Sequence, residues 1–93
     1  IGVIGIDRDL TLVQANKVWF RTMSDNFSLL GRNITEFMPA EIFSLLEKIR
    51  AQGRGLSRMN INGVQGRLIG SRLQGSHEQE GMIFVFIRED DIL

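Results

Sequence analysis

An unbroken apolar run lies near the C-terminal end of the chain. Residues 82–87 read Met-Ile-Phe-Val-Phe-Ile, and these β-branched and aromatic side chains favour extended backbone. An edge strand usually alternates apolar and polar residues, so the run predicts a strand inside a sheet that is buried on both faces. The charged residues 88–91 follow at once and cannot enter a core. This exit from a central strand fits either a relay to a neighbouring domain or a solvated tail.

Four other segments have the pattern of strands and form two predicted hairpins. Residues 1–6 and 10–15 flank a short polar turn. Residues 56–61 and 64–73 flank Asn62-Gly63, and Asn-Gly favours a two-residue turn because both of its positions need positive φ.

The two-residue turn fixes the register of the second hairpin, with Ile61 opposite Val64. Side chains then alternate between the faces of the sheet. One face receives Met59, Ile61, Val64 and Leu68, and the other receives Leu56, Arg58, Arg67 and Ile69.

Helical signals fill the middle of the chain. Asn16 is a good N-cap for a short helix over 17–23 that places Trp19, Phe20 and Met23 on one face. Residues 27–30 predict a single turn, and residues 33–36 have the spacing of a capping box with Glu36 reaching back to Asn33.

The strongest helix signal covers residues 40–52. Pro39 suits its start, and the glycines at 53 and 55 end it. Apolar residues repeat at helical spacing at Ile42, Leu45, Leu46 and Ile49, with Phe43 at the margin of this stripe. Two strands, helical pieces and three strands predict an α+β domain, in which an antiparallel sheet carries short helices on one face.

Composition narrows the classes of function. The 93 residues are enough for one domain, and 11 basic and 11 acidic residues give no net charge, which argues against direct binding to nucleic acid. The chain has no cysteine, which excludes disulfides and thiolate chemistry and fits the cytoplasm. No apolar run approaches the roughly 20 residues that span a bilayer, so we expect no membrane insertion. Because the sequence starts at Ile1, we expect a piece of a longer protein.

The order of elements resembles the PAS domain, a small sensory module of bacterial kinases, cyclases and transcription regulators. The residues that carry the resemblance are 2–7, 15–20, 30–34, the helix after Pro39, and 81–87. The family implies a five-stranded antiparallel sheet in the order 2-1-5-4-3, with the last strand in the centre. It also implies that residues 1–93 are one sensory domain excised from a longer signalling protein. Residues 91–93 lie near the motif that couples such domains to an effector, although its Thr is absent.

The resemblance also allows known cofactors to be tested against the residues. Gly31-Arg32-Asn33-Ile34 is similar to the start of the flavin-photosensor motif, but Ile34 replaces the adduct-forming Cys, which excludes that photochemistry. Haem sensors of the family place a His near the long helix, and residues 40–53 contain none. The single His77 lies in a polar loop, where solvation is the simpler interpretation. The coumarate-type photoreceptors need a Cys as well. We therefore expect no cofactor, while an unidentified small ligand stays open.

Neither a catalytic constellation nor a metal-ligand cluster is visible, so we expect no enzyme. A small-molecule pocket is one hypothesis, because glycines on the inner face leave space and a buried Arg holds carboxylates well. The alternative is that the glycines let the helix pack closely and that Arg72 extends to the rim. The candidate ligand residues are Arg32, Phe43, Met59, Gly66, Gly70 and Arg72.

The outer face of the sheet is the second candidate site. Arg58 and Arg67 are expected opposite each other and would repel unless an acidic group intervenes, for example residues 89–91 of a second copy. A homodimer would cover this face, and so would a helix that precedes the domain. The candidate partner residues are Val3, Leu56, Arg58, Arg67, Ile69, Ile83, Val85 and Ile87.

Three functions are compatible with these features of the sequence. The first is a sensory domain that regulates an effector in the same polypeptide by dimerising and by binding a small ligand. The second is a ligand-free module for dimerisation and assembly. The third, an enzyme fragment, would require a cleft with clustered ionisable groups.

Overall fold

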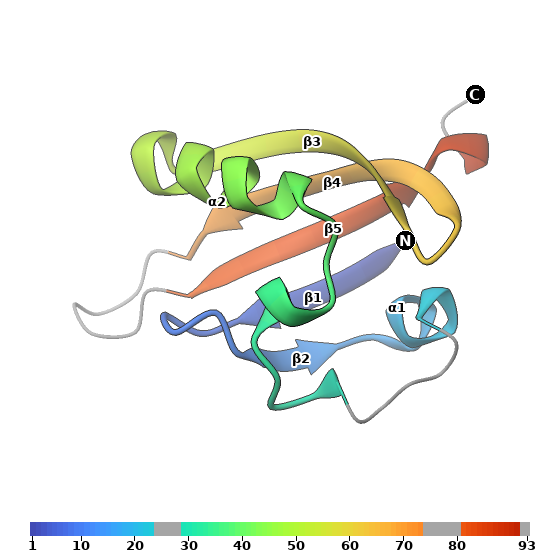
Figure 1. The fold of residues 1–93 in the computed structure, drawn as a ribbon, viewed down its shortest axis with the longest axis horizontal. Coiled ribbons are helices and arrows are strands. Elements are labelled where there is room, and N and C mark those ends of the chain that lie inside the picture. Colours follow the sequence, from blue (N-terminus) through green and yellow to red (C-terminus); the bar gives the residue numbers. More distant parts are fainter. Residues whose placement is uncertain (24–28, 74–80, 92–93) are drawn as a thin grey trace.

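The computed structural model describes residues 1–23, 29–73 and 81–91 and contains one five-stranded antiparallel sheet (Figure 1). The N-terminal hairpin consists of β1 (Gly2–Ile6) and β2 (Leu12–Ala15), and the second hairpin of β3 (Arg54–Ile61) and β4 (Val64–Arg72). The last strand is β5 (Met82–Arg88). The helical elements are α1 (Lys17–Thr22), α2 (Glu41–Gln52) and the short 3-10 helices η2 (Ile34–Glu36) and η3 (Glu89–Asp91).

The strand order β2-β1-β5-β4-β3 confirms the predicted topology. β5 lies in the centre, hydrogen-bonded to β1 on one side and to β4 on the other. The β3–β4 pairing runs without a register shift, with Ile61 opposite Val64 as the Asn-Gly turn predicts. Asn62 and Gly63 both have positive φ, at 53° and 85°, which is the backbone conformation that this turn requires.

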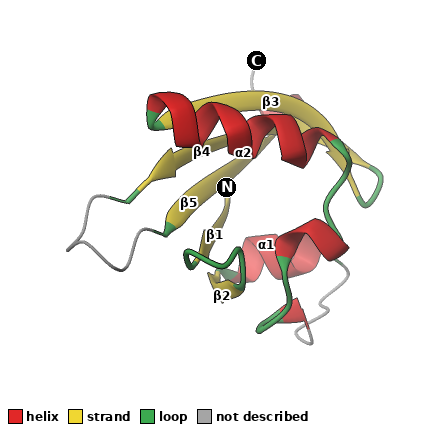
Figure 2. Cartoon of the chain, turned by 60° about the vertical axis from the view of Figure 1, so that its left-hand side comes forward, coloured by secondary structure: helices red, strands yellow, loops and turns green. Residues whose placement is uncertain are grey.

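The helices cover one face of the sheet, and no helix covers the other face within the described ranges. Figure 2 shows α2 over β3 and β4, with α1 beside β1 at the other end of the sheet. A single core fills the space between the two layers. Its fully buried members include Trp19 of α1, Ile42 and Ile49 of α2, and Phe84 and Phe86 of β5. None of the helices in the described part of the chain is long and apolar enough to cross a membrane.

Local capping explains where the two α-helices begin and end. The Asn16 side chain accepts a hydrogen bond from the Trp19 amide at 3.0 Å, so the predicted N-cap is confirmed. Gly53 ends α2 with φ of 87°, a left-handed conformation that costs glycine little. The prediction that Gly55 also helps to end the helix is wrong, because Gly55 lies inside β3.

The predicted capping box at residues 33–36 is wrong in one half. Asn33 does cap η2, because its Oδ1 accepts from the Thr35 amide at 2.9 Å. Glu36 does not reach back to Asn33 and instead pairs with Arg32 at 2.7 Å. Arg32 lies four residues before Glu36, and its charged Nε–H is a stronger donor to the carboxylate than the neutral Asn33 amide.

The prediction that β5 is buried on both faces is also wrong for this chain alone. Its residues alternate between buried and partly exposed positions, and Ile83 keeps 36% of its surface accessible. Met82, Phe84 and Phe86 point into the core, and the intervening residues point to the uncovered face. The apolar run therefore predicts the central position of the strand correctly. Its outward-pointing side chains, however, are covered by no other part of the described chain.

Candidate functional site

The inner face of the sheet is filled at Gly66 and Gly70, as the close-packing alternative predicts and the pocket hypothesis does not. A Cβ built on Gly66 would lie 2.5 Å from the Ile87 carbonyl oxygen and 2.7 Å from the Phe86 ring. A Cβ on Gly70 would lie 2.5 Å from Ile49 Cδ1 and 2.6 Å from the Phe84 ring. The space beside both glycines is thus occupied by the protein's own side chains and backbone.

The other candidate ligand residues do not gather around these glycines. Met59 is buried in the core, whereas Phe43 lies on the outer side of α2 with 58% of its surface exposed. The Arg32 side chain is exposed and forms the ion pair with Glu36. Arg72 Nη1 donates to the Arg50 carbonyl at 3.1 Å, near the C-terminal end of α2, where positive charge suits the helix dipole.

One buried polar atom in the core has no partner among the described residues. Trp19 is fully buried, and its indole Nε1–H donates to no acceptor there. Its ring packs edge to face on Phe86, with the centroids 6.5 Å apart. An unpaired buried donor costs about 1–3 kcal/mol. The apolar pattern predicts that Trp19 is buried, but it does not reveal that Nε1 lacks an acceptor, because the position of every nearby acceptor depends on the whole fold.

The outer face carries a continuous apolar row across four strands. Val3, Val85, Ile69 and Leu56 are direct cross-strand neighbours, from β1 through β5 and β4 to β3. Leu56 and Ile69 are 46% and 37% exposed. Ile83 and Ile87 lie on the same face of β5, on either side of the row. The structure thus brings the apolar members of the predicted partner face together.

Arginines lie along one side of the row, next to Leu56 and Ile69. Arg58 and Arg67 are opposite each other, as the register predicts, and Arg67 in turn is opposite Ile87. The acidic group that relieves their repulsion comes from the same chain, because Glu89 Oε1 lies 2.5 Å from Arg58 Nη2. The expectation that a second copy supplies this group is therefore not needed.

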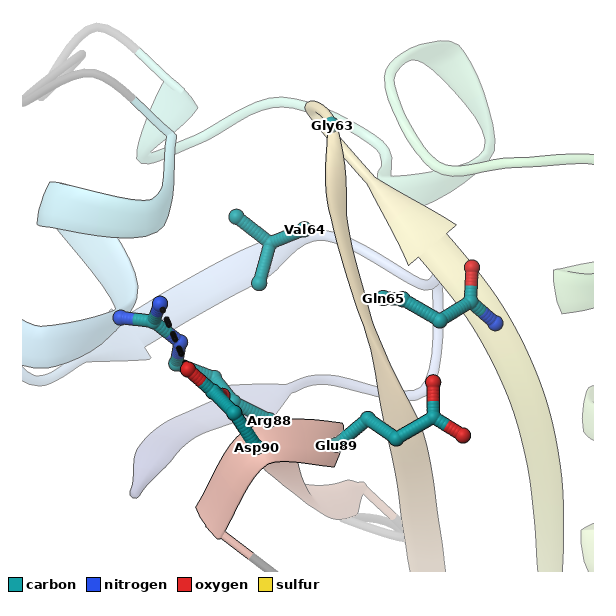
Figure 3. A pocket seen from close by; sticks show the side chains of 6 residues that line it. All are labelled: Gly63, Val64, Gln65, Arg88, Glu89 and Asp90. Atoms are coloured by element: carbon teal, nitrogen blue, oxygen red, sulfur yellow. Dashed lines mark hydrogen bonds and ion pairs between the residues drawn. The ribbon is translucent and has the colours of Figure 1, made fainter.

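A shallow depression lies where β5 leaves the sheet (Figure 3). Arg88 and Asp90 line it and are 3.4 Å apart, and both side chains are about half exposed or more. Its other lining residues are Gly63, Val64, Gln65 and Glu89. No nucleophile is among these residues, and within the described part of the chain no group of three or more His, Cys, Asp or Glu residues could hold a metal ion. The prediction on His77 falls outside the described residues.

Comparison with known proteins places the fold. No protein-family model and no curated protein sequence matches the chain. A domain of an HTR-like protein from Haloarcula marismortui superposes with a TM-score of 0.71 at 13% identity, covering 95% of this chain and 96% of that one. A sensory box sensor histidine kinase from Vibrio cholerae gives a TM-score of 0.70 at 13% identity, covering 94% and 80%.

A third similar structure is the Aer2 receptor of Vibrio cholerae, described as a dual PAS-haem oxygen sensor. It superposes with a TM-score of 0.68 at 11% identity and covers 95% of this chain and 93% of that one. Together with the strand order 2-1-5-4-3, these likenesses show that the chain has the PAS fold.

Proposed function

We propose that this domain is a regulatory module of a longer bacterial signalling protein, such as a histidine kinase, a cyclase or a transcription regulator. In this proposal two copies associate through the outer face of the sheet and control an effector in the same polypeptide. The observation that carries the proposal is the apolar row Val3–Val85–Ile69–Leu56, which crosses four strands on the face that no described helix covers. Contiguous apolar surface of this kind marks interaction sites.

The central strand gives this association a physical route to the effector. β5 contributes Ile83, Val85 and Ile87 to the outer face and continues directly into η3. A partner that binds one of two arrangements of the sheet more tightly would shift the equilibrium between them by the difference in its binding free energies. The position of the chain that follows β5 would change with that equilibrium.

The filled inner face supports the form of the proposal in which no ligand binds. Phe84, Phe86 and Ile49 occupy the space beside Gly66 and Gly70, where a ligand pocket was one of the two hypotheses. Ligand binding is the second candidate because Trp19 Nε1 is a buried donor without an acceptor among the described residues. A small molecule with an acceptor oxygen would satisfy that donor. Thermal melts with a panel of small carboxylates and carbonyl compounds test this candidate, which predicts a higher Tm.

Sedimentation of the isolated domain tests the association. We expect a dimer, and we expect Ile83→Glu to raise the dimer dissociation constant at least about tenfold, which corresponds to about 1.4 kcal/mol. Phe43→Glu is the matched control, because Phe43 is an exposed apolar residue on α2, away from the outer face. A wild-type domain that stays monomeric at high concentration, or a Phe43→Glu effect as large as that of Ile83→Glu, contradicts the proposal.

A further inference from the structure

The two edges of the sheet are finished differently. The β2 edge is covered by the segment that follows α1, because the Leu12 amide donates to the Arg32 carbonyl and the Gly31 amide donates to the Leu12 carbonyl, both at 2.8 Å. Thr11 and Asn33 form a further bridge beside it. No described segment pairs with the outer side of β3. The described part of the domain therefore has one closed edge and one open edge.

The hairpin register identifies which backbone groups the open edge presents. In a two-residue hairpin the flanking residues Ile61 and Val64 bond to each other, so the alternate residues of β3 from Ile61 backward point their N–H and C=O toward β4. The residues between them, Arg54, Leu56, Arg58 and Asn60, point theirs away from the sheet. The Arg58 carbonyl receives one side-chain contact there, from the Ser57 hydroxyl at 3.3 Å.

This edge lacks most of the features that keep strands from pairing. β3 is eight residues long, contains no proline, and pairs with β4 without a bulge. Its protection consists of charge, from the exposed residues Arg54 and Arg58. Positive charge alone does not prevent every strand from pairing with this edge. It repels a second copy of β3 and attracts an acidic strand.

The side chains along the edge specify the partner further. Arg54, Leu56 and Arg58 lie on the outer face in the order basic, apolar, basic. Lys48 of α2 adds positive charge on the helix side, since a Cβ on Gly55 would lie 3.2 Å from Lys48 Cβ. Glu89 already pairs with Arg58, so an incoming carboxylate would share or replace that contact.

We propose that the open edge of β3 is a second docking site, which borders the outer face and uses the outward-pointing backbone groups of β3, and which binds an extended acidic segment of a partner protein by adding a sixth strand to the sheet. The outward-pointing N–H and C=O groups of Leu56 and Arg58 supply the backbone pairing, as in other cases of strand addition. Acidic side chains opposite Arg54 and Arg58, with an apolar side chain opposite Leu56, supply the preference.

A capped peptide with the sequence Glu-Thr-Val-Thr-Glu tests this site, with Lys-Thr-Val-Thr-Lys as the matched control. We expect the acidic peptide to slow hydrogen exchange of the Leu56 and Arg58 amides at least about tenfold at saturation. The basic peptide is expected to leave both amides unchanged. Protection confined to Ile69 and Val85, or equal protection by both peptides, overturns the proposal.

Two variants separate the backbone from the charge contribution. Leu56→Pro removes an outward N–H that β4 does not use, so we expect the domain to fold and the peptide to lose its effect. Arg54→Glu keeps the backbone and is expected to weaken binding of the acidic peptide at least about tenfold. If Leu56→Pro does not fold, the Arg54→Glu variant decides the question alone. Unchanged binding of the acidic peptide to folded Arg54→Glu overturns the proposal. The Arg54→Glu domain should still dimerise, which distinguishes failure of this site from failure of the outer face.

Discussion

Asn16 connects three parts of the chain through one short side chain. Its Oδ1 accepts from the Val3 amide in β1 and from the Trp19 amide in α1, each at 3.0 Å. Its Nδ2 donates to the Ile1 carbonyl at 2.9 Å, and its own amide donates to the Val3 carbonyl at 3.0 Å. The residue thus acts as an N-cap and also continues the pairing of β1 beyond β2.

We expect Asn16→Ala to lower the free energy of unfolding by about 1–2 kcal/mol, because it removes a helix cap and leaves the Val3 amide without its acceptor. Asn16→Asp keeps the acceptor oxygen and loses only the donation to Ile1, so its loss should be smaller. Urea denaturation followed by circular dichroism measures both. Equal losses of unfolding free energy in the two variants would show that the acceptor oxygen of Asn16 does not account for its stabilising effect.

Residue-scale predictions from sequence succeeded at two positions where the cause is local, although the local return contact of Glu36 to Asn33 did not form. The cap at Asn16 and the positive φ at Asn62 depend on a few neighbouring residues, and both are confirmed. From sequence, residues 89–91 are proposed as the acidic partner of Arg58 but in a second copy, because only the folded sheet brings Glu89 of the same chain to a residue 31 positions away. The unpaired Trp19 indole likewise depends on every element around it.

At the scale of elements, close packing between β4 and β5 depends on glycine. Gly66 lies opposite Arg88, and a Cβ there would meet the Ile87 carbonyl, which belongs to the backbone of the neighbouring strand and cannot turn aside. We expect Gly66→Ala to destabilise the domain by about 1–3 kcal/mol through overpacking. Thermal unfolding followed by calorimetry measures the loss.

Gly5→Ala is the matched control, because a Cβ on Gly5 would meet only Gln14 at 3.7 Å, an ordinary contact distance. Its effect should stay within about 0.5 kcal/mol. A neutral or stabilising Gly66→Ala would instead indicate open space on the inner face, and it would favour the ligand-binding candidate over the ligand-free module.

The elements themselves follow closely from the sequence pattern, whereas their exposure does not. Helical spacing predicts α2, and its observed range Glu41–Gln52 differs from the prediction by one residue. The continuous apolar run predicts a central β5 correctly and its two-sided burial wrongly. The pattern shows which side chains are apolar, and nothing within the described residues removes the outer side chains of β5 from water. The sequence leaves two interpretations of the inner face open, a ligand space and close packing at the glycines, and choosing between them depends on where the Ile49, Phe84 and Phe86 side chains lie.

At the scale of the whole molecule, β5 joins two parts of the core. One part contains α1 and β1, and the other contains α2, β3 and β4. Phe86 lies between them, since its ring packs against Trp19 of α1 and fills the space beside Gly66 of β4. A domain of this size has a small core, so we expect its stability to depend on this ring more than on any surface residue.

Phe86→Ala should therefore lower the free energy of unfolding by about 3–5 kcal/mol, because it removes a buried ring and leaves a cavity that the β-sheet backbone cannot close. Stabilities of small domains are about 5–15 kcal/mol in total, so the loss should lower the Tm by more than about 10 °C. Phe43→Ala is the control of equal chemistry at an exposed position and should change stability by less than about 0.5 kcal/mol. Comparable losses for the two variants would mean that the two parts of the core are not joined through β5. Phe43 would then have a packing role that its exposure in this chain does not reveal.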